Sequence, residues 1–219
     1  MLTQEQLTMM AENVAHIREK MAAAAREAGR DPADILLCAA CKTRTVEEVI
    51  ASAVLPIDLF GENHVQELVE KTDANAYCGK PGHFIGHLQT NKVRQVVGKV
   101  SLIQSVDSER LLAAIDREAA RQDIVQDILL EVNIGEEASK SGFAAEDILP
   151  LMEKIGEFSN ICIKGLMAIP PISHISGENQ KFFQKMFHLS VDIRQKKYDN
   201  VKVDCLSMGM SGDFADAIA

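Results

Sequence analysis

The pattern of apolar and polar residues divides the chain into one long helix and a series of short strands. Thr3 and Gln6 can form a capping box, and apolar residues then recur at helical spacing until Gly29 and Pro32 interrupt them. This pattern predicts a long first helix. Residues 35–41 form a continuous apolar run, which is typical of a strand buried on both faces of a parallel sheet.

Six more short apolar runs follow, and each is separated from the next by a segment long enough for a helix. These runs are residues 57–60, 83–86, 102–105, 128–132, 161–166 and 203–206. Strands that alternate with helices imply parallel pairing, because a parallel neighbour needs a crossover connection. The pattern therefore predicts an α/β fold with about seven βα units, close to a (β/α)8 TIM barrel.

The end of the sequence bears on closure of this barrel. Residues 213–219 look like the opening of a helix, so an eighth strand would follow the last printed residue. We therefore expect that the eighth strand is missing from this sequence. No linker or internal repeat interrupts the pattern, and the length suits one core, so we expect a single domain over residues 1–219.

Composition narrows the classes of partner. The net charge of −9 disfavours nucleic acid and anionic membranes, because both are polyanions that such a field repels. The first ten residues lack a signal-peptide pattern, and no apolar run is long enough to cross a bilayer. We expect a cytoplasmic monomer that binds neither nucleic acid nor membranes.

The five cysteines are scattered and do not resemble a disulfide framework. Cys38 and Cys41 form a C-x-x-C sequence. Residues three apart on a strand point to opposite faces, so the pair is not expected to share a metal or a redox bond. We expect two small buried residues and no metal site.

Functional residues of a (β/α) barrel gather at the C-terminal ends of its strands, and Lys42 follows the first apolar run. Its parity matches that of Cys38 and Ala40, whose small side chains leave room for a ligand. A desolvated lysine amine is the usual Schiff-base nucleophile. The alternative is a lysine that reaches solvent or pairs with Glu62. The strand position alone favours neither.

Polar residues also follow later runs. Asn63 could hydrogen-bond a ring hydroxyl of a ligand or hold the lysine, and it could equally cap the next helix. His87 could contact a ligand, although a structural role at the rim is more common for such a histidine. Residues 139–143, Ser-Lys-Ser-Gly-Phe, could form a ligand-binding rim loop or a simple glycine turn.

Residues 206–213, Leu-Ser-Met-Gly-Met-Ser-Gly-Asp, follow the seventh run. Glycines and serines before a helix offer N–H groups and hydroxyls to an anion, and the loops after strands seven and eight are the common phosphate site of these barrels. Helix capping by Ser211 or Asp213 would explain the polarity of the loop but not its glycine spacing.

Several sequence blocks together resemble the pyridoxal phosphate (PLP) homeostasis protein family, the YggS/PROSC type, related to the alanine racemase N-terminal barrel. The blocks are Lys42-Thr43, Phe60-Gly61-Glu62-Asn63, Val65-Gln66-Glu67, the stretch 83–92, the stretch 104–108, Val132-Asn133-Ile134, the stretch 139–143, Gly165-Leu166-Met167 and the stretch 206–211. They run in order over nearly the whole chain.

The resemblance implies a barrel that holds PLP as a Schiff base on Lys42. Other residues implied near the cofactor are Asn63, His87 and Met167, with Ser207, Gly209 and Ser211 around the phosphate. His64 stands where the family commonly has tyrosine. The family also continues into an eighth strand that carries an arginine facing the pyridine nitrogen and a glycine of the phosphate cup. Without that strand, PLP affinity should fall.

The resemblance also implies a role as a carrier that buffers PLP and supplies apo-enzymes dependent on it, without catalytic turnover. A racemase-like enzyme is the alternative, but a racemase needs a second base, and Tyr77 and Tyr198 do not follow predicted strands. A regulatory protein for which PLP is a signal is a third hypothesis.

Overall fold

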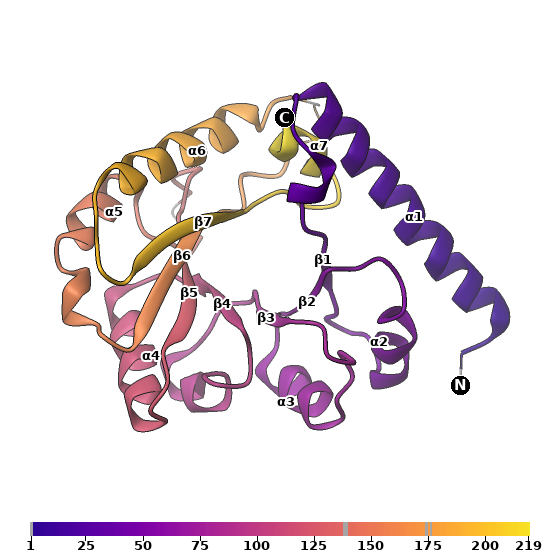
Figure 1. Cartoon of the computed structure of the whole chain (residues 1–219), viewed down its shortest axis with the longest axis horizontal. Coiled ribbons are helices and arrows are strands. Elements are labelled where there is room, and N and C mark those ends of the chain that lie inside the picture. Colours follow the sequence, from indigo (N-terminus) through magenta and orange to yellow (C-terminus); the bar gives the residue numbers. More distant parts are fainter. Residues whose placement is uncertain (1, 138–139, 174, 176) are drawn as a thin grey trace.

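Seven parallel strands form one curled sheet whose order in space is the order in sequence, β1 to β7, in the computed structural model (Figure 1). The structure describes residues 2–137, 140–173, 175 and 177–219. The strands are β1 Cys38–Ala40, β2 Leu59–Glu62, β3 Gly82–Phe84, β4 Leu102–Val106, β5 Gln126–Glu131, β6 Ile161–Met167 and β7 Val201–Ser207. The predicted α/β fold with seven parallel strands is confirmed.

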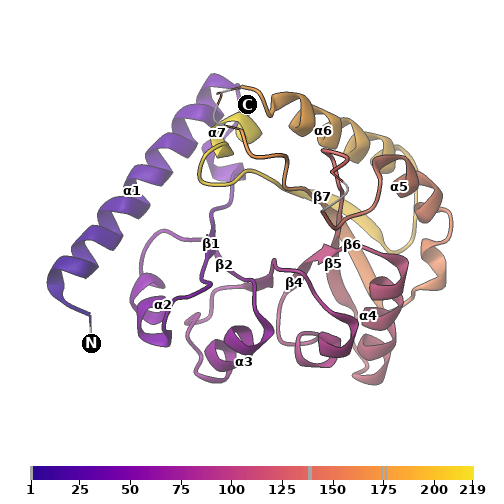
Figure 2. The same ribbon diagram turned by 180° about the vertical axis from the view of Figure 1, so that it is seen from behind.

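Helices cover the convex side of this sheet (Figures 1 and 2). They are α1 Gln4–Glu27, α2 Val46–Ser52, α3 Val65–Asp73, α4 Glu109–Arg121, α5 Ala145–Met152, α6 Gln180–Gln195 and α7 Phe214–Ile218. Three 3₁₀ turns, Pro32–Asp34, Thr90–Gln95 and Ile155–Glu157, complete the connections. Because all neighbouring strands are parallel, their C-terminal ends lie at the same rim.

The first helix begins as the sequence predicts. Thr3 is its N-cap, and the reciprocal hydrogen bonds of the capping box with Gln6 are both present. Near its C-terminal end, Met21 and Ala25 pack against Ile218 of α7. Figure 1 shows α7 lying beside α1, between the two edge strands β1 and β7.

The sheet buries different residues on its two sides. The main core lies between the strands and the helices and includes Phe60, Ile103, Ile128 and Leu166. A second cluster joins Leu102, Leu129 and Met167 with Cys205, all from strands, so it lies on the concave side. The interior of the curl is therefore apolar at this level, with polar residues nearer the strand ends.

The edge strand β1 differs from the prediction. It spans three residues instead of seven, and the side chains of Leu36 and Ala40 are exposed, so the strand is not buried on both faces. The Asp58 carboxylate accepts the Leu37 N–H at 2.6 Å in place of a regular strand partner. The inner face of β1 opens between the two edges of the sheet, which explains the exposure of Ala40.

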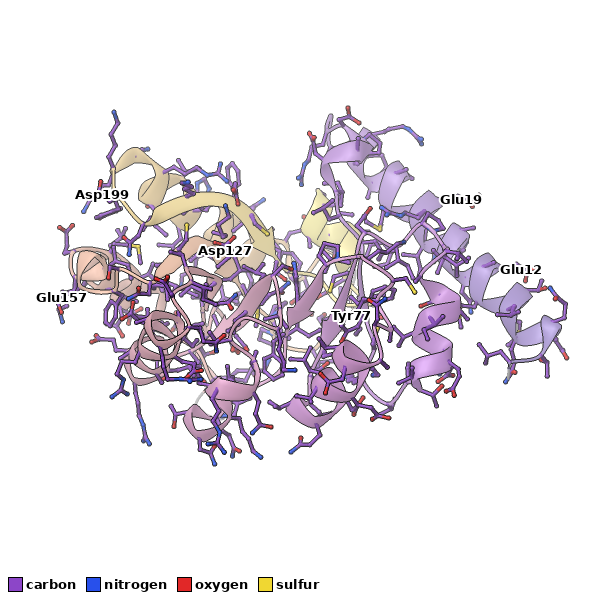
Figure 3. The ribbon with its side chains drawn as sticks, turned by 60° about the horizontal axis from the view of Figure 1, so that its bottom comes forward. Glu12, Glu19, Tyr77, Asp127, Glu157 and Asp199 are labelled. Carbon is purple, nitrogen blue, oxygen red and sulfur yellow. The ribbon has the colours of Figure 1, made fainter. Side chains whose placement is uncertain are left out.

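The acidic charge is spread over the surface. Figure 3 shows Glu12 and Glu19 on α1 and Glu157 and Asp199 on the opposite side of the molecule, all directed outward. Of the helices that the structure describes, none is both long and apolar enough to cross a membrane.

Candidate functional site

Lys42 lies in the tight turn that joins β1 to α2. The Arg44 N–H donates to the Cys41 carbonyl at 3.0 Å, which closes the turn, and Thr45 caps the helix that follows. The Lys42 side chain is exposed, and it has no hydrogen-bond or ion-pair partner among the described residues. The amine is therefore available at the C-terminal rim of the sheet.

The turn is fixed from behind by a network of three ionisable residues, of which Glu62 and Lys71 are buried and Glu67 is partly exposed. Lys71 Nζ donates to Glu62 Oε1 at 2.8 Å, to Glu67 Oε2 at 3.2 Å and to the Cys41 carbonyl at 2.7 Å. Glu67 Oε2 also accepts the Thr43 N–H at 2.8 Å. The proposed pairing of Lys42 with Glu62 is wrong, because Glu62 lies on the core face of β2 and pairs with Lys71 there.

Electrostatics favour the charged forms of Lys71 and Glu67, whereas burial, opposed by Lys71, raises the pKa of Glu62. Burial works to lower the pKa of Lys71, but the hydrogen bonds and charges of Glu62 and Glu67 outweigh it and raise the pKa. Burial likewise works against the charged form of Glu67, yet the Thr43 N–H and Lys71 hold the pKa of this carboxyl below its ordinary value. Lys71 is therefore a cation and Glu67 an anion at neutral pH.

Asn63 follows β2 at the same rim. Its Oδ1 atom is buried and accepts no hydrogen bond within the described part of the chain. The N-cap of α3 is His64, and no side chain caps that helix, so capping by Asn63 is wrong. A buried amide oxygen without a donor is costly, and a ligand with an N–H or O–H group would satisfy it.

A chain of hydrogen bonds crosses the concave side of the sheet. Ser207 Oγ donates to Gln104 Oε1 at 2.6 Å, and Gln104 Nε2 lies 2.8 Å from His83 Nδ1. Since the amide oxygen is taken by the serine, the amide nitrogen donates and His83 Nδ1 accepts. Burial lowers the pKa of His83 to about 4, consistent with a neutral ring in this position.

The loop after β7 presents backbone donors. The N–H groups of Gly209, Ser211 and Gly212 have no acceptor among the residues that the structure describes. Gly209 has φ +87°, and a Cβ there would lie 2.8 Å from the Phe214 Cα, so α7 folds back too closely for any other residue. The Asp213 carboxylate accepts the Met210 N–H at 2.6 Å and not an α7 amide, so helix capping does not explain the loop.

A cluster of ionisable residues occupies the rim at β3, β4 and β5. His87 Nδ1 lies 3.1 Å from Asp107 Oδ2, so His87 is partnered by a carboxylate at an exposed position. Burial raises the pKa of Glu131, and the Asp107 charge adds to this effect. The sequence pointed to His87 but to neither carboxylate.

The remaining predicted residues have distinct positions. Met167 is buried on the concave side and pairs in register with Ser207. Cys38 and Cys41 point to opposite faces as predicted, but only Cys41 is buried, in the outer core, whereas Cys38 is half-buried, so the expectation of two buried cysteines is wrong for Cys38. Burial, with a smaller contribution from Cys205 on β7, raises the pKa of Cys38 to about 12. Ser139 lies outside the described residues.

Sequence reasoning missed the partners that hold these residues. Lys71 and Glu67 face the turn at Lys42 from one helical turn of α3, and Gln104 with His83 faces Ser207 from two neighbouring strands. For the first group, the available signal was the spacing of Glu67 and Lys71, which lie four residues apart and therefore on the same face of a helix. The second group connects residues about a hundred positions apart, so no local pattern could reveal it.

Comparison with known proteins places these features in a family. Residues 6–219 match the family described as the alanine racemase N-terminal domain. A pyridoxal phosphate homeostasis protein from Aquifex aeolicus is 38% identical over 207 residues, which cover 94% of this chain and 90% of that protein.

Solved structures agree with this match. An unknown protein from Bifidobacterium adolescentis is 31% identical with a TM-score of 0.93, over 100% of this chain and 92% of that one. PipY from Synechococcus elongatus PCC7942, solved with PLP bound, is 26% identical with a TM-score of 0.77, over 92% of each chain. The chain therefore belongs to the pyridoxal phosphate homeostasis protein family, with the fold of the alanine racemase N-terminal domain.

Proposed function

We propose that this protein binds PLP covalently on Lys42 and acts as a carrier that buffers the cofactor and supplies it to apo-enzymes. The observation that carries the proposal is the Lys42 amine, which is exposed and unpartnered among the described residues at the strand-end rim. When bound, PLP would supply an aldehyde carbon that the Lys42 amine could attack, with one water as the leaving molecule. Two findings support PLP as the cofactor: the relative from Aquifex aeolicus is named a pyridoxal phosphate homeostasis protein, and the structure of PipY was solved with PLP bound.

The residues present fit this cofactor. Small or half-buried side chains, Cys38 and Ala40, precede Lys42 on the same face of β1. The unsatisfied Oδ1 of Asn63 would accept a hydrogen from a polar group of the ligand. Asn63 is thus our candidate for the residue that orients the ring beside Lys42.

The loop after β7 fits the phosphate. Its free N–H groups at Gly209 and Ser211 are donors to an anion, and the exposed Ser211 hydroxyl adds another. Ser207 would join them by turning its hydroxyl from Gln104 toward the anion. His87 and Met167 complete the proposed surroundings of the cofactor, His87 at the rim and Met167 beside Ser207 on the neighbouring strand.

The positions of the tyrosines favour a carrier over a racemase-like enzyme. Tyr77 stacks on Phe60 on the convex side of the sheet, with ring centroids 5.5 Å apart, and Figure 3 shows it on the side of α3. Tyr198 precedes β7, and its hydroxyl lies 3.4 Å from Glu153 Oε1. Tyr77 is buried in the core, and Tyr198 precedes the N-terminal end of β7, at the rim opposite Lys42. We propose a cytoplasmic monomer that engages apo-PLP enzymes.

The test of the cofactor is the absorption spectrum of the purified protein with PLP, before and after borohydride, followed by peptide mass mapping. We expect a long-wavelength band that disappears on reduction and leaves a pyridoxyl group on Lys42. Absence of the band, or a pyridoxyl group only on other lysines, would overturn the proposal.

A second experiment separates the carrier from the enzyme. The PLP-loaded protein is incubated with L-alanine in deuterated water, and exchange at the α-carbon is followed by NMR. A carrier should give no exchange above that of free PLP, while a PLP-dependent apo-enzyme added to the same protein should regain activity. Rapid exchange would support the racemase-like alternative.

A further inference from the structure

The two peptide groups on either side of Lys42 are held by charged side chains from outside the turn. The carbonyl before it, on Cys41, accepts from Lys71 Nζ at 2.7 Å, and the N–H after it, on Thr43, donates to Glu67 at 2.8 Å. Lys71 and Glu67 also bond each other at 3.2 Å. A single connected group of atoms thus fixes the backbone immediately before and after the reactive lysine.

The turn needs this support because its conformation is unfavourable. Thr43 has φ +64°, in the left-handed region, which a β-branched residue rarely adopts and which costs about 1–2 kcal/mol. Glycine or asparagine would be the usual residue at this position of the turn. The hydrogen bond from the Thr43 N–H to Glu67 offsets the strain and selects this conformation.

The network is an expensive way to build a core. The side chains of Lys71 and Glu62 are 2% and 0% exposed, and buried ion pairs are often no more stable than apolar residues of the same volume. Stability alone therefore does not account for two buried charges at this point. Their contacts with the turn supply another reason.

We propose that Glu62, Lys71 and Glu67 form a positioning network that fixes the Cys41–Arg44 turn and so presents the Lys42 amine to PLP in one geometry. Lys71 and Glu67 hold the turn, and Glu62 holds Lys71. In this proposal none of the three residues contacts the cofactor itself. Because the backbone at Lys42 is already ordered, PLP binding loses little conformational entropy there. This inference rests on the proposed attachment of PLP to Lys42.

The full chain provides a graded set of variants. Glu67→Ala removes the acceptor of the Thr43 N–H, whereas Glu67→Gln keeps an oxygen there. The double variant Glu62→Leu/Lys71→Met removes the contact with the Cys41 carbonyl while filling the volume with apolar atoms, which avoids a lone buried charge. Glu118→Ala on α4 is the matched control, because Glu118 also bonds two side chains, Arg121 and Gln122, at a distant helix.

Two readouts are measured on each variant: the PLP dissociation constant, with mapping of the borohydride adduct, and the hydrogen exchange rate of the Thr43 amide by NMR without PLP. We expect Glu67→Ala to speed the exchange and weaken PLP binding, each by about tenfold, as the loss of one charge-assisted hydrogen bond implies. The double variant should stay folded and also bind about tenfold more weakly. Glu67→Gln should recover most of both properties, and Glu118→Ala should match the wild type.

The possible outcomes separate this inference from the proposed function. If Glu67→Ala and the double variant lower the melting temperature but bind PLP as the wild type does, the network is structural only and the inference is overturned. An unchanged exchange rate of the Thr43 amide in Glu67→Ala overturns it as well. If the wild type gives no adduct on Lys42, the proposed function fails first, and the inference falls with it.

Discussion

The turn after β1 and the loop after β7 follow the two edge strands of the same curled sheet, yet they are built in opposite ways. In the turn, the Cys41 carbonyl accepts two hydrogen bonds and the Thr43 N–H meets a carboxylate. In the described loop, three N–H groups, on Gly209, Ser211 and Gly212, have no intramolecular acceptor. In the turn, the Cys41 carbonyl and the Thr43 N–H both have partners, whereas the loop leaves several N–H groups available to a ligand.

The difference matches two requirements of binding a phosphorylated aldehyde. A covalent bond forms at one atom, so the amine that makes it benefits from a backbone held in one geometry. An anion is bound by several donors at once, so the loop that binds it must leave those donors free. The comparison predicts that damage to the turn affects covalent attachment, while damage to the loop affects recognition of the phosphate.

The largest effect is expected from Lys42→Ala. Without the amine no Schiff base can form at this position, so the long-wavelength band and the borohydride adduct should both be lost, while the melting temperature changes little because the side chain is exposed. Absorption spectra and peptide mapping measure this. Lys20→Ala, an exposed lysine on α1, is the control and should keep the band. A full adduct on another lysine in Lys42→Ala would contradict the assignment.

The loop is tested most strongly by Gly209→Val. The side chain would meet Phe214 and Ala217 at less than 3 Å, and the φ of +87° costs a branched residue about 1–3 kcal/mol. We expect PLP affinity to fall by about tenfold to a hundredfold, at about 1.4 kcal/mol for each factor of ten. Gly212→Ala is the matched control, because a Cβ there meets nothing within 4 Å. Equal losses in both variants would show that the Gly209 geometry is not what matters.

The strand pattern was predictable because buried parallel strands are continuous apolar runs, and the first helix because Thr3 and Gln6 carry their own capping signal. Lys42 was recognised from its place after a strand. The exposure of the Lys42 side chain was not predictable, because it depends on Glu62 pairing with Lys71 instead of Lys42. That pairing is determined by how β2 and α3 pack in the core. The length of β1 was overestimated because Asp58, far along the chain, takes the Leu37 N–H.

Within the described part of the chain, the Ser207 side chain bonds to Gln104, which in turn bonds to His83, and the stability of this link should respond to pH. The pKa of His83 is about 4 in the fold and about 6.5 when the chain unfolds, so the folded protein takes up its proton at a lower pH than the unfolded chain. The stabilisation is therefore complete above about pH 6.5 and declines as the pH falls toward and below about 4, by about 3 kcal/mol in all. Urea unfolding between pH 7 and pH 4 measures it.

In His83→Gln this part of the pH dependence should vanish, since glutamine can still accept from Gln104 but does not titrate in this range. His16→Gln on the exposed face of α1 should leave the pH dependence as it is. If the wild type and His83→Gln lose stability in parallel as the pH falls, His83 is not the group responsible.

The smallest effect is expected from Ser211→Ala. The Ser211 side chain is exposed and has no partner in the part of the chain that the structure describes, so the free energy of unfolding should not change. Loss of one hydroxyl donor should weaken PLP binding by about threefold to tenfold. Pyridoxal, which lacks the phosphate, should bind Ser211→Ala and the wild type equally, and Kd measurements for both compounds provide the comparison. If pyridoxal binding falls as much as PLP binding, Ser211 contacts another part of the cofactor, and the division between an attachment turn and a phosphate loop must be redrawn.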